Sequence, residues 1–203
     1  MKLYFTPTSP YVRKVMVAAH ETGLIGRIET IFLRPTPVKA DPVLSKDNPL
    51  SKIPALLEDG KPALYDSPVI CEYLDGLHGG KKLIPPSGPE RWRVLRTQAL
   101  TDGILEAAIL VFYEVHHRPA ELHWSPWLDG QREKAQQGLD ALEHEVTLFA
   151  DDVDLAQVCT GVTLGWLEFR NVLGDIRARR PKLFAWYDGF RKRPGMVATE
   201  PKG

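Results

Sequence analysis

The sequence predicts an α/β domain followed by an all-α domain. Before residue 80, short runs rich in β-branched and apolar residues alternate with runs of helical period, whereas nearly every segment after residue 90 has helical period. Between them, residues 85–89 contain three prolines and a glycine, which can continue neither a helix nor a central strand. We therefore expect a first domain over residues 1–80, a linker over 81–89 and an all-helical second domain over 90–203.

Composition and charge narrow the class of function. Of the 203 residues, 43% are hydrophobic, and 26 lysines and arginines balance 26 aspartates and glutamates. These values are typical of a globular protein without an overall positive field, so we expect neither nucleic acid nor a membrane as a partner. The first residues, MKLYFTPTSP, contain no apolar run of signal-peptide length, and we expect a cytoplasmic protein.

The first domain is predicted to contain a four-stranded mixed sheet. A helical run that follows the turn at 6–10 and stops at Gly23 joins the first two strands, which makes a βαβ unit with parallel strands. Asp59-Gly60 is a hairpin signal between the last two strands. Ser67 is the expected N-cap of the last helix, with Pro68 at its first position. Strands are expected at 2–5, 28–33, 53–57 and 63–65, and a weak short helix at about 41–47.

The second domain is predicted to contain four helical runs, at 90–116, at 129–149, from 155 onward and after Pro181. The third begins with Asp154 as N-cap and Gln157 three residues later, a variant of the capping box. It is largely apolar through Trp166, so we expect it at the centre of the bundle. A basic cluster is expected to be solvated; its members are Arg177, Arg179, Arg180, Lys182, Arg191, Lys192 and Arg193.

Four stretches, taken in order and at their separations, resemble the glutathione transferase superfamily over essentially the whole chain. They are TSPYVRKV at 8–15, NPLSKIPAL at 48–56, YDSPVI at 65–70 and RPKLFAWY at 180–187. The first resembles the serine-type active-site turn of that family. The resemblance implies a thioredoxin-like N-terminal domain, an all-helical C-terminal bundle, glutathione as co-substrate and a homodimer.

Ser9 is the catalytic residue that the resemblance implies. Glutathione reacts as a thiolate, whereas a free thiol has a pKa of about 8.5 and is mostly protonated near neutral pH. A hydroxyl that donates to the sulfur at the positive end of a helix favours the anion. Ser9 could instead act only as a helix cap, and Thr8 is the alternative donor. We expect Arg13 and Lys14 to be solvated helix charges.

Ile53 and Pro54 are expected to bind the cysteinyl backbone of glutathione. The resemblance implies a cis bond before Pro54, although the residues alone allow either isomer. A cis turn would expose the backbone N–H and C=O of Ile53, which can pair with a bound peptide as a strand edge does.

Asp66 and Ser67 are expected to bind the γ-glutamyl end of glutathione. The N–H and hydroxyl of Ser67, at a helix N-terminus, suit the α-carboxylate, and Asp66 suits the ammonium group. Lys39 and Lys52 are the two candidates for the glycine carboxylate, and the choice between them stays open.

The electrophile is expected between the domains, against the long first helix of the second domain. Tyr113 and His116 are the predicted contacts, with Trp124 and Trp127 as further walls. No metal site is expected, because adjacent histidines on a helix point apart and two cysteines cannot supply four ligands. Those cysteines, Cys71 and Cys159, lie in apolar helical runs, and we expect them to be core residues and not nucleophiles.

The predicted function is that of an enzyme, a glutathione transferase that conjugates the glutathione thiolate to a small hydrophobic electrophile in detoxification. Two alternatives stay open: a glutathione-dependent isomerase or dehalogenase on the same fold, and a non-catalytic binding module. The electrophile itself is not predicted, because hydrophobic pockets discriminate weakly between similar substrates.

Overall fold

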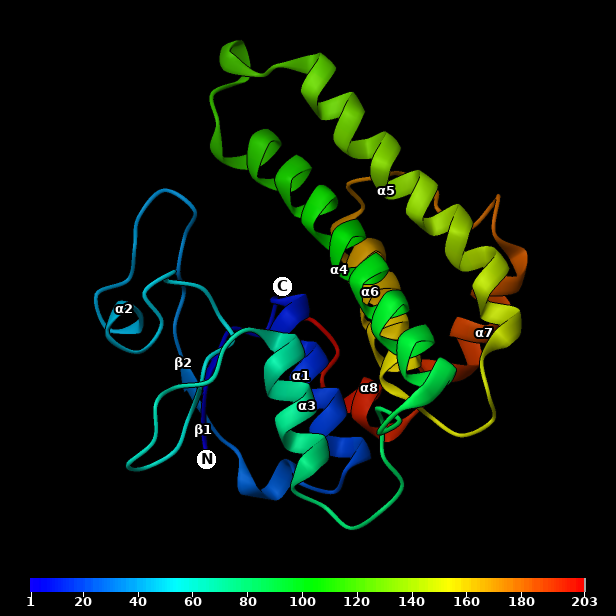
Figure 1. Ribbon diagram of the computed structural model, residues 1–203. Coiled ribbons are helices and arrows are strands. Elements are labelled where there is room, and N and C mark those ends of the chain that lie inside the picture. Colours follow the sequence, from blue (N-terminus) through cyan, green and yellow to red (C-terminus); the bar gives the residue numbers. More distant parts are fainter. Residues whose placement is uncertain (203) are drawn as a thin grey trace.

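The computed structural model describes residues 1–202, in which a small sheet with its helices precedes a helical bundle (Figure 1). β1 pairs in parallel with β2 and antiparallel with β3, so the strand order is β2-β1-β3. The parallel pair confirms the predicted βαβ unit. The elements of this first part are β1 (Lys2–Phe5), α1 (Pro10–Glu21), the 3-10 helix η1 (Ile25–Arg27), β2 (Glu29–Phe32), α2 (Leu44–Asp47), β3 (Leu56–Leu57) and α3 (Ser67–Gly76).

The prediction of a fourth strand at 63–65 is wrong. Only Leu64 pairs, with Leu56, in an isolated antiparallel bridge. Pro62 has no amide N–H to donate and α3 begins at Ser67, so no room is left for a longer ladder. The sheet therefore has three strands and one bridging residue.

The two faces of the sheet pack against different helices (Figure 1). Side chains alternate along β1 because the strand period is two residues. Leu3 packs into the main core with α1 and α3, while Tyr4 packs on the other face with Leu44 of α2 and Ala55. The hydroxyl of Tyr4 also donates to Asp47 at 2.7 Å, which fixes α2.

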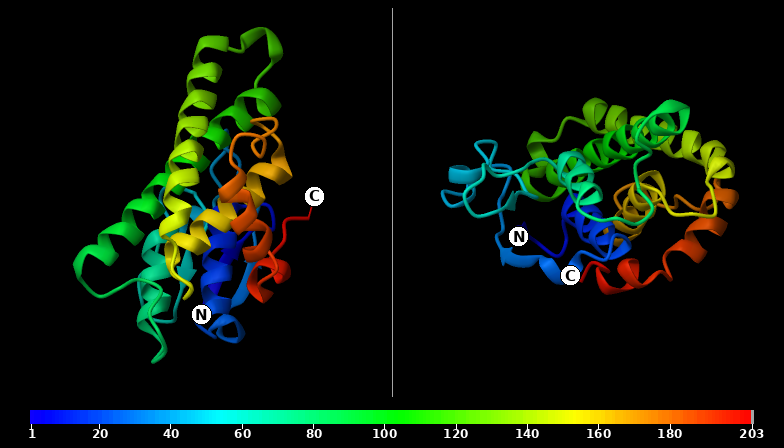
Figure 2. Two further views of the ribbon diagram at one scale, coloured as in Figure 1. Left: turned by 90° about the vertical axis from the view of Figure 1, so that its right-hand side faces the viewer. Right: turned by 60° about the horizontal axis from the view of Figure 1, so that its bottom comes forward.

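In the second part of the chain, α4 and α5 form a long antiparallel pair that extends past the other helices (Figures 1 and 2). All residues from Leu155 to Leu167 of α6 are buried, which confirms its predicted place at the centre of the bundle. The elements are α4 (Gly88–His117), η2 (Ala120–Leu122), α5 (Ser125–Glu145), η3 (Val146–Leu148), α6 (Leu155–Arg170), α7 (Pro181–Phe190) and α8 (Pro194–Ala198).

The start of α6 shows only half of the predicted capping box. Asp154 accepts from the backbone N–H of Gln157 at 3.0 Å. The side-chain amide of Gln157 does not return to the cap but donates to the carbonyls of Ala150 and Asp152, at 2.8 and 3.1 Å. Gln157 therefore holds the loop before α6 in place.

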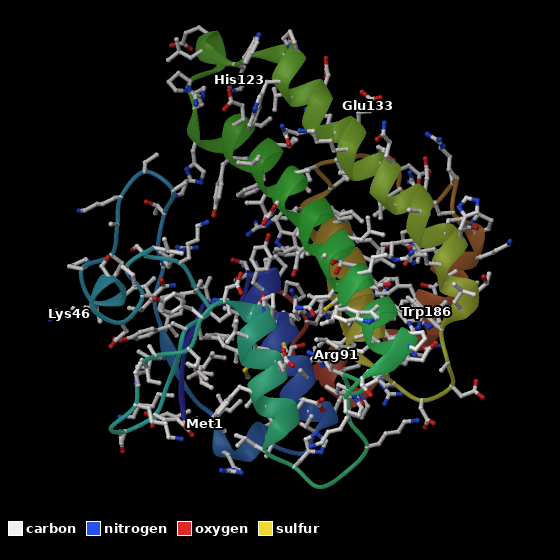
Figure 3. The ribbon with its side chains drawn as sticks, in the orientation of Figure 1. Met1, Lys46, Arg91, His123, Glu133 and Trp186 are labelled. Atoms are coloured by element: carbon white, nitrogen blue, oxygen red, sulfur yellow. The ribbon has the colours of Figure 1, made fainter. Side chains whose placement is uncertain are left out.

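Polar side chains join the two parts of the chain. Asp75 of α3 accepts from the backbone N–H groups of Leu83 and Ile84, at 2.8 and 3.0 Å, and so holds the connection to α4. Arg91, near the start of α4 and labelled in Figure 3, pairs with Glu72 of α3 at 2.8 Å.

The prediction that the basic cluster is solvated is wrong for Arg180. Its side chain is 0% exposed and pairs with Asp140 at 2.6 Å. Its guanidinium also donates to the side chain of Gln136 at 2.6 Å and to the carbonyl of Ile176 at 3.2 Å. A charge this deep is tolerated because several acceptors surround it.

Candidate functional site

Ser9 caps α1 at the end of the sheet where β1 ends. The residue has extended backbone angles, and its Oγ accepts from the N–H of Val12 at 3.3 Å. Ser9 is half-buried, and its hydroxyl hydrogen has no acceptor within residues 1–202. The two interpretations of Ser9, cap and donor, are therefore compatible, because the oxygen caps the helix while the proton is available to a ligand.

The N-termini of α1 and α3 lie at the same end of the sheet. β1 runs directly into α1. Leu64 is antiparallel to Leu56, which is itself antiparallel to β1, so the chain enters α3 in the same direction as it enters α1. Two helix N-termini therefore present free N–H groups and positive dipole ends to one region, which favours an anionic ligand.

Trp166 of α6 holds the turn before Ser9. Its Nε1–H donates to the backbone carbonyl of Thr8 at 3.1 Å, and only 3% of its surface is exposed. This contact between the two parts of the chain was not predicted, since an apolar helix with one tryptophan carries no signal for a partner 158 residues away. It fixes the residue next to the candidate catalytic hydroxyl.

The loop before β3 presents the backbone of Ile53. The Ile53–Pro54 peptide bond is cis, as the resemblance implies. The N–H and C=O of Ile53 take no part in the backbone hydrogen bonds of the described chain. Asn48, only 2% exposed, orders the loop by donating to the carbonyl of Lys52 at 2.8 Å and accepting from the N–H of Leu50 at 3.0 Å.

Asp66 and Ser67 stand at the start of α3, shifted by one position from the prediction. Ser67 is the first helical residue and Asp66 the N-cap, whose side chain makes no capping hydrogen bond. Ser67 was predicted as the N-cap, and boundaries assigned from sequence commonly differ by one residue. Ser67 is 1% exposed while Asp66 is exposed, so a ligand would meet Asp66 directly and Ser67 only at its edge.

Tyr11 links the Ser9 turn to α4, a position that the sequence reasoning missed. Burial raises the pKa of its phenol far above the ordinary value, and the carboxylates of Asp102, Glu106 and Asp66 raise it further. Tyr11 is therefore a neutral hydroxyl at physiological pH. Lys14 neutralises Asp102, so the exposed carboxylates of Asp66 and Glu106 are the groups on this side of the site that suit an ammonium group.

The prediction that Arg13 and Lys14 are solvated is wrong. They are 6% and 1% exposed, because α1 is covered by α3, α6 and α8. Arg13 donates to the carbonyl of Met196 in α8 at 3.0 Å. At Gly165 of α6, an added Cβ would lie 2.5 Å from the guanidinium of Arg13, so the glycine leaves room for the end of this side chain.

Lys14 forms an ion pair with Asp102 of α4 beneath Tyr11. Burial by itself would lower the pKa of Lys14, but the carboxylate of Asp102 opposes that change, and the pKa lies above the ordinary value. Burial raises the pKa of Asp102, and Lys14 opposes that change. The pair joins α1 to α4 where the two parts of the chain meet.

Tyr113 and His116 lie at the C-terminal end of α4, among aromatic side chains. The ring of Phe112 stacks on His116 at 4.3 Å between centroids and meets Trp166 edge-on at 6.4 Å. Burial raises the pKa of Tyr113, whereas His116 is exposed. Trp166 thus connects this cluster to Thr8, while Trp124 is 64% exposed beyond the end of α4.

Lys39 and Lys52 are both exposed, and Lys52 directly precedes Ile53 in the loop before β3. Lys39 forms an isolated bridge with Thr36 after β2, and Lys52 offers its carbonyl to Asn48. Their predicted role stays open.

Cys71 and Cys159 are buried, as expected of core residues. Burial raises the pKa of both thiols, that of Cys159 to about 12. Neither can supply a thiolate near neutral pH, so any reactive thiol at this site has to come from a ligand.

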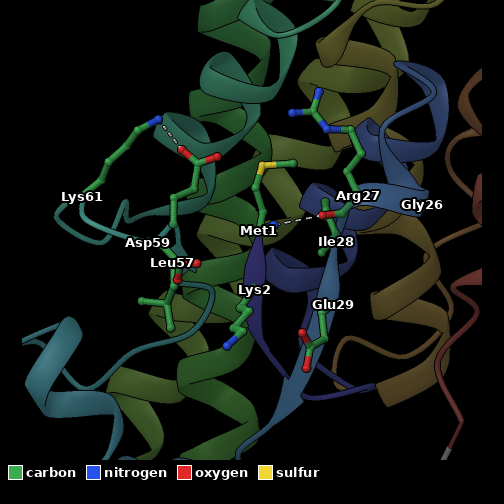
Figure 4. A pocket seen from close by; sticks show the side chains of 10 residues that line it. Met1, Lys2, Gly26, Arg27, Ile28, Glu29, Leu57, Asp59 and Lys61 are labelled. Atoms are coloured by element: carbon green, nitrogen blue, oxygen red, sulfur yellow. Dashed lines mark hydrogen bonds and ion pairs between the residues drawn. The ribbon is translucent and has the colours of Figure 1, made fainter.

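A hollow of about 510 Å³ lies at the opposite end of the sheet (Figure 4). Its lining includes Lys2 and Glu29, which begin β1 and β2, and both signs of charge occur around it. We call it the basal hollow; it is lined by Met1, Lys2, Gly26, Arg27, Ile28, Glu29, Leu57, Glu58, Asp59 and Lys61. Ser9 follows the other end of β1, so this hollow is not part of the predicted site.

Two further observations concern ions and membranes. Within residues 1–202, no group of three or more histidine, cysteine, aspartate or glutamate side chains could hold a metal ion. Of the helices in that same range, none combines the length and the apolar character that crossing a membrane requires.

Comparisons with known proteins agree with this geometry. The profile of the glutathione S-transferase N-terminal domain matches residues 8–77, and that of the C-terminal domain matches residues 125–189. The chain is 33% identical to the uncharacterized GST-like protein YibF of Escherichia coli K12, over 99% of this chain and 98% of that protein.

Two crystal structures of a glutathione transferase family member from Pseudomonas fluorescens Pf-5 are similar along their whole length. One, with bound glutathione, is 46% identical with a TM-score of 0.97 and covers 100% of this chain and 99% of that chain. The other, with bound S-(propanoic acid)-glutathione, is 45% identical with a TM-score of 0.92 and covers 100% of both chains.

Proposed function

Because the chain belongs to the glutathione S-transferase family, we propose that it is a glutathione transferase whose Ser9 hydroxyl stabilises the glutathione thiolate. The observation that carries this proposal is the position of Ser9, a helix N-cap whose proton is free, next to a second helix N-terminus at Asp66-Ser67. A hydroxyl and a helix dipole directed at the sulfur lower the pKa of a thiol.

The remaining roles follow from the chemistry of glutathione. Asp66 binds the γ-glutamyl ammonium group, supported by the exposed carboxylate of Glu106, which also acts on Tyr11. The first-turn N–H groups of α3, at Ser67, bind the α-carboxylate. The free backbone groups of Ile53, before Pro54, pair with the cysteinyl residue.

The sulfur then attacks an electrophilic carbon held by the side chains at the end of α4, including Tyr113 and His116. A carbon–sulfur bond forms, and either a leaving group departs or the adjacent atom takes a proton. The relative that holds S-(propanoic acid)-glutathione, a thioether, supports this type of product. Lys39 or Lys52 as partner of the glycine carboxylate, a cytoplasmic homodimer and a role in detoxification belong to the same proposal and rest on the family resemblance.

Calorimetric titration with glutathione tests the proposal. Wild type should bind glutathione, and Ser67→Ala should bind it more weakly because the hydroxyl is lost from the α-carboxylate site. Ser9→Ala should bind with near-normal affinity but with a raised pKa of the bound thiol. Absence of measurable affinity in the wild type would favour a non-catalytic module that kept the fold.

A further inference from the structure

Arg170 differs from most arginines of this protein because it has no carboxylate partner. Ten of the 14 arginines form a salt bridge within residues 1–202. The other four, in the same range, are Arg13, Arg27, Arg34 and Arg170. Arg13 has backbone and hydroxyl acceptors in α8 and just after it, whereas the guanidinium of Arg170 has no hydrogen-bond acceptor in the described chain.

The side chain of Arg170 is nevertheless held in place. Its guanidinium carbon lies 4.6 Å from the ring centroid of Phe112 in α4 and 4.6 Å from that of Phe169. Its Nε is buried without a partner. Stacking on aromatic rings orients the planar guanidinium and leaves its N–H groups for an anion.

Aromatic side chains connect Arg170 to the proposed site of reaction. It is one helical turn beyond Trp166, so both side chains are on the same face of α6. Trp166 binds the carbonyl of Thr8, next to Ser9, and meets Phe112 edge-on. Phe112 therefore contacts both Trp166 and Arg170, which connects the unpaired cation to the Ser9 turn through two residues.

A second cation without a carboxylate partner adds to this region. Arg34 follows β2, where the hydroxyl of Thr6 donates to the carbonyl of Leu33, so the start of this loop lies beside the Ser9 turn. Burial lowers the pKa of Arg170, the adjacent Tyr113 raises it, and the charge of Arg34 lowers it again. Two like charges that affect each other, neither of them with a carboxylate partner in the described chain, favour binding of a negative group.

We propose that Arg170, assisted by Arg34, binds a carboxylate on the electrophile, so that the second substrate is an electrophile with an apolar body and an acidic group. Phe112 and Tyr113 contact the apolar body. The guanidinium of Arg170 pairs with the carboxylate through two parallel hydrogen bonds. This inference rests on the proposed function and specifies its substrate class.

Binding of two matched glutathione thioethers tests the inference. S-(2-carboxyethyl)glutathione carries the carboxylate, and S-(2-carbamoylethyl)glutathione has the same shape without the charge. Because charge-assisted hydrogen bonds are strong, wild type should bind the carboxylate thioether about tenfold or more tightly than the amide. Raising the salt concentration should reduce that preference.

Variants assign the preference to Arg170. Arg170→Gln should reduce it to about twofold or less while leaving the affinity for glutathione itself unchanged, and Arg170→Lys should keep part of it because charge without a planar fork remains. Arg34→Gln should reduce the preference for the carboxylate thioether by less than Arg170→Gln does. Arg27→Gln is the matched control, since Arg27 also lacks a carboxylate partner in residues 1–202 but lines the basal hollow; it should keep the full preference.

Several outcomes would overturn the inference. One is a wild type that binds both thioethers equally well, and this measurement needs no variant. Another is a preference that survives in Arg170→Gln. A third is an equal loss of glutathione affinity in that variant, which would assign Arg170 to the glycine carboxylate. Failure of the proposed function would look different, because the wild type would then bind neither glutathione nor either thioether.

Discussion

The two ends of the small sheet offer opposite chemistry. The N-termini of α1 and α3 lie at the end with Ser9, and the hydroxyl hydrogen of Ser9 has no acceptor within residues 1–202. The other end has the basal hollow of about 510 Å³, and two of the polar groups that line it are bound within the protein. The amino group of Met1 donates to the carbonyl of Arg27 at 3.1 Å, and Lys61 pairs with Glu58 at 2.6 Å. The N-termini of two helices and a free hydroxyl hydrogen, not volume, therefore distinguish the candidate site.

The ion pairs of the two ends also differ in burial. Lys14, which pairs with Asp102 beneath Tyr11, is 1% exposed, whereas the side chain of Lys61 is 61% exposed. A buried charge left without its partner is costly, but an exposed one is solvated. The Ser9 end therefore depends on its ion pair for stability, and the basal end does not.

The largest effect is expected from Lys14→Met. Removal of Lys14 leaves the carboxylate of Asp102 in a largely buried position without its cation, which should lower the free energy of unfolding by about 3–5 kcal/mol. Urea unfolding followed by circular dichroism measures this loss. The matched variant Lys61→Met should leave the midpoint of unfolding nearly unchanged, and similar losses in both variants would remove the contrast in stability between the two ends.

The next largest effect is expected from Ser9→Ala. Loss of the hydroxyl donor should raise the pKa of the thiol of bound glutathione by about 1–2 units, which corresponds to about 1.4–2.7 kcal/mol. The ultraviolet absorbance of the thiolate, followed against pH, measures this pKa. Asp59→Asn in the basal hollow should leave it unchanged; an unaltered thiol pKa in Ser9→Ala would make Thr8 the better donor.

Local signals in the sequence were sufficient for most of the fold. Periodicity predicted the βαβ unit and the buried α6, and Asp154 caps α6 where its spacing to Gln157 indicates. Signals of this kind act within a few residues, and they fail where a strand forms only by pairing with another strand. The strand predicted at 63–65 needed a ladder partner that Pro62 and the start of α3 do not leave room for.

The candidate site was predictable in the residues of its family motifs but not in the residues that support them. Ser9, Ile53 and Asp66 could be predicted because motifs of the family carry them. Lys14 and Arg180 were expected in solvent, since a sequence shows a charge but not the helices that cover it or the distant acid that pairs with it. Trp166 likewise meets Thr8 only because α6 packs on α1.

Alkaline titration of Cys159 tests the interior behind the Ser9 turn. Burial raises its pKa to about 12 from an ordinary 9.0. Between those values the unfolded thiol ionises while the native one does not. The free energy of unfolding should therefore fall by about 1.4 kcal/mol per pH unit on account of this group as pH rises through that window.

Cys159→Ala should reduce that alkaline slope by the same amount. Val158→Ala is the matched control, because it removes neighbouring buried volume without removing a titrating group; it should lower stability at all pH values and keep the slope. If the free energy of unfolding fell equally steeply with pH in wild type and in Cys159→Ala, the thiol would be accessible to water. The interior behind Ser9 would then be as exposed to solvent as the basal end.

The smallest effect belongs to Glu58 at the basal end. Hydrogen bonds from Lys61 and Tyr73 hold the pKa of this carboxyl below its ordinary value of 4.5. A lowered native pKa contributes stability that is present above the unfolded value and is lost as pH falls through the native one. Solvent screens this pair, so the contribution should be below about 0.5 kcal/mol.

Carbon-13 NMR of the Glu58 carboxyl measures its pKa in the wild type and in the variants Tyr73→Phe and Lys61→Met. Each variant should move the pKa of Glu58 upward toward 4.5, the lysine change by the larger step because Lys61 contributes most to the lowering. High salt should weaken the contribution of Lys61 and spare the hydrogen bond from the Tyr73 hydroxyl. A carboxyl that titrates at its ordinary value in the wild type would mean that Glu58 is unpaired in solution, and the comparison between the buried ion pair at the Ser9 end and the exposed one at the basal end would then lose its second member.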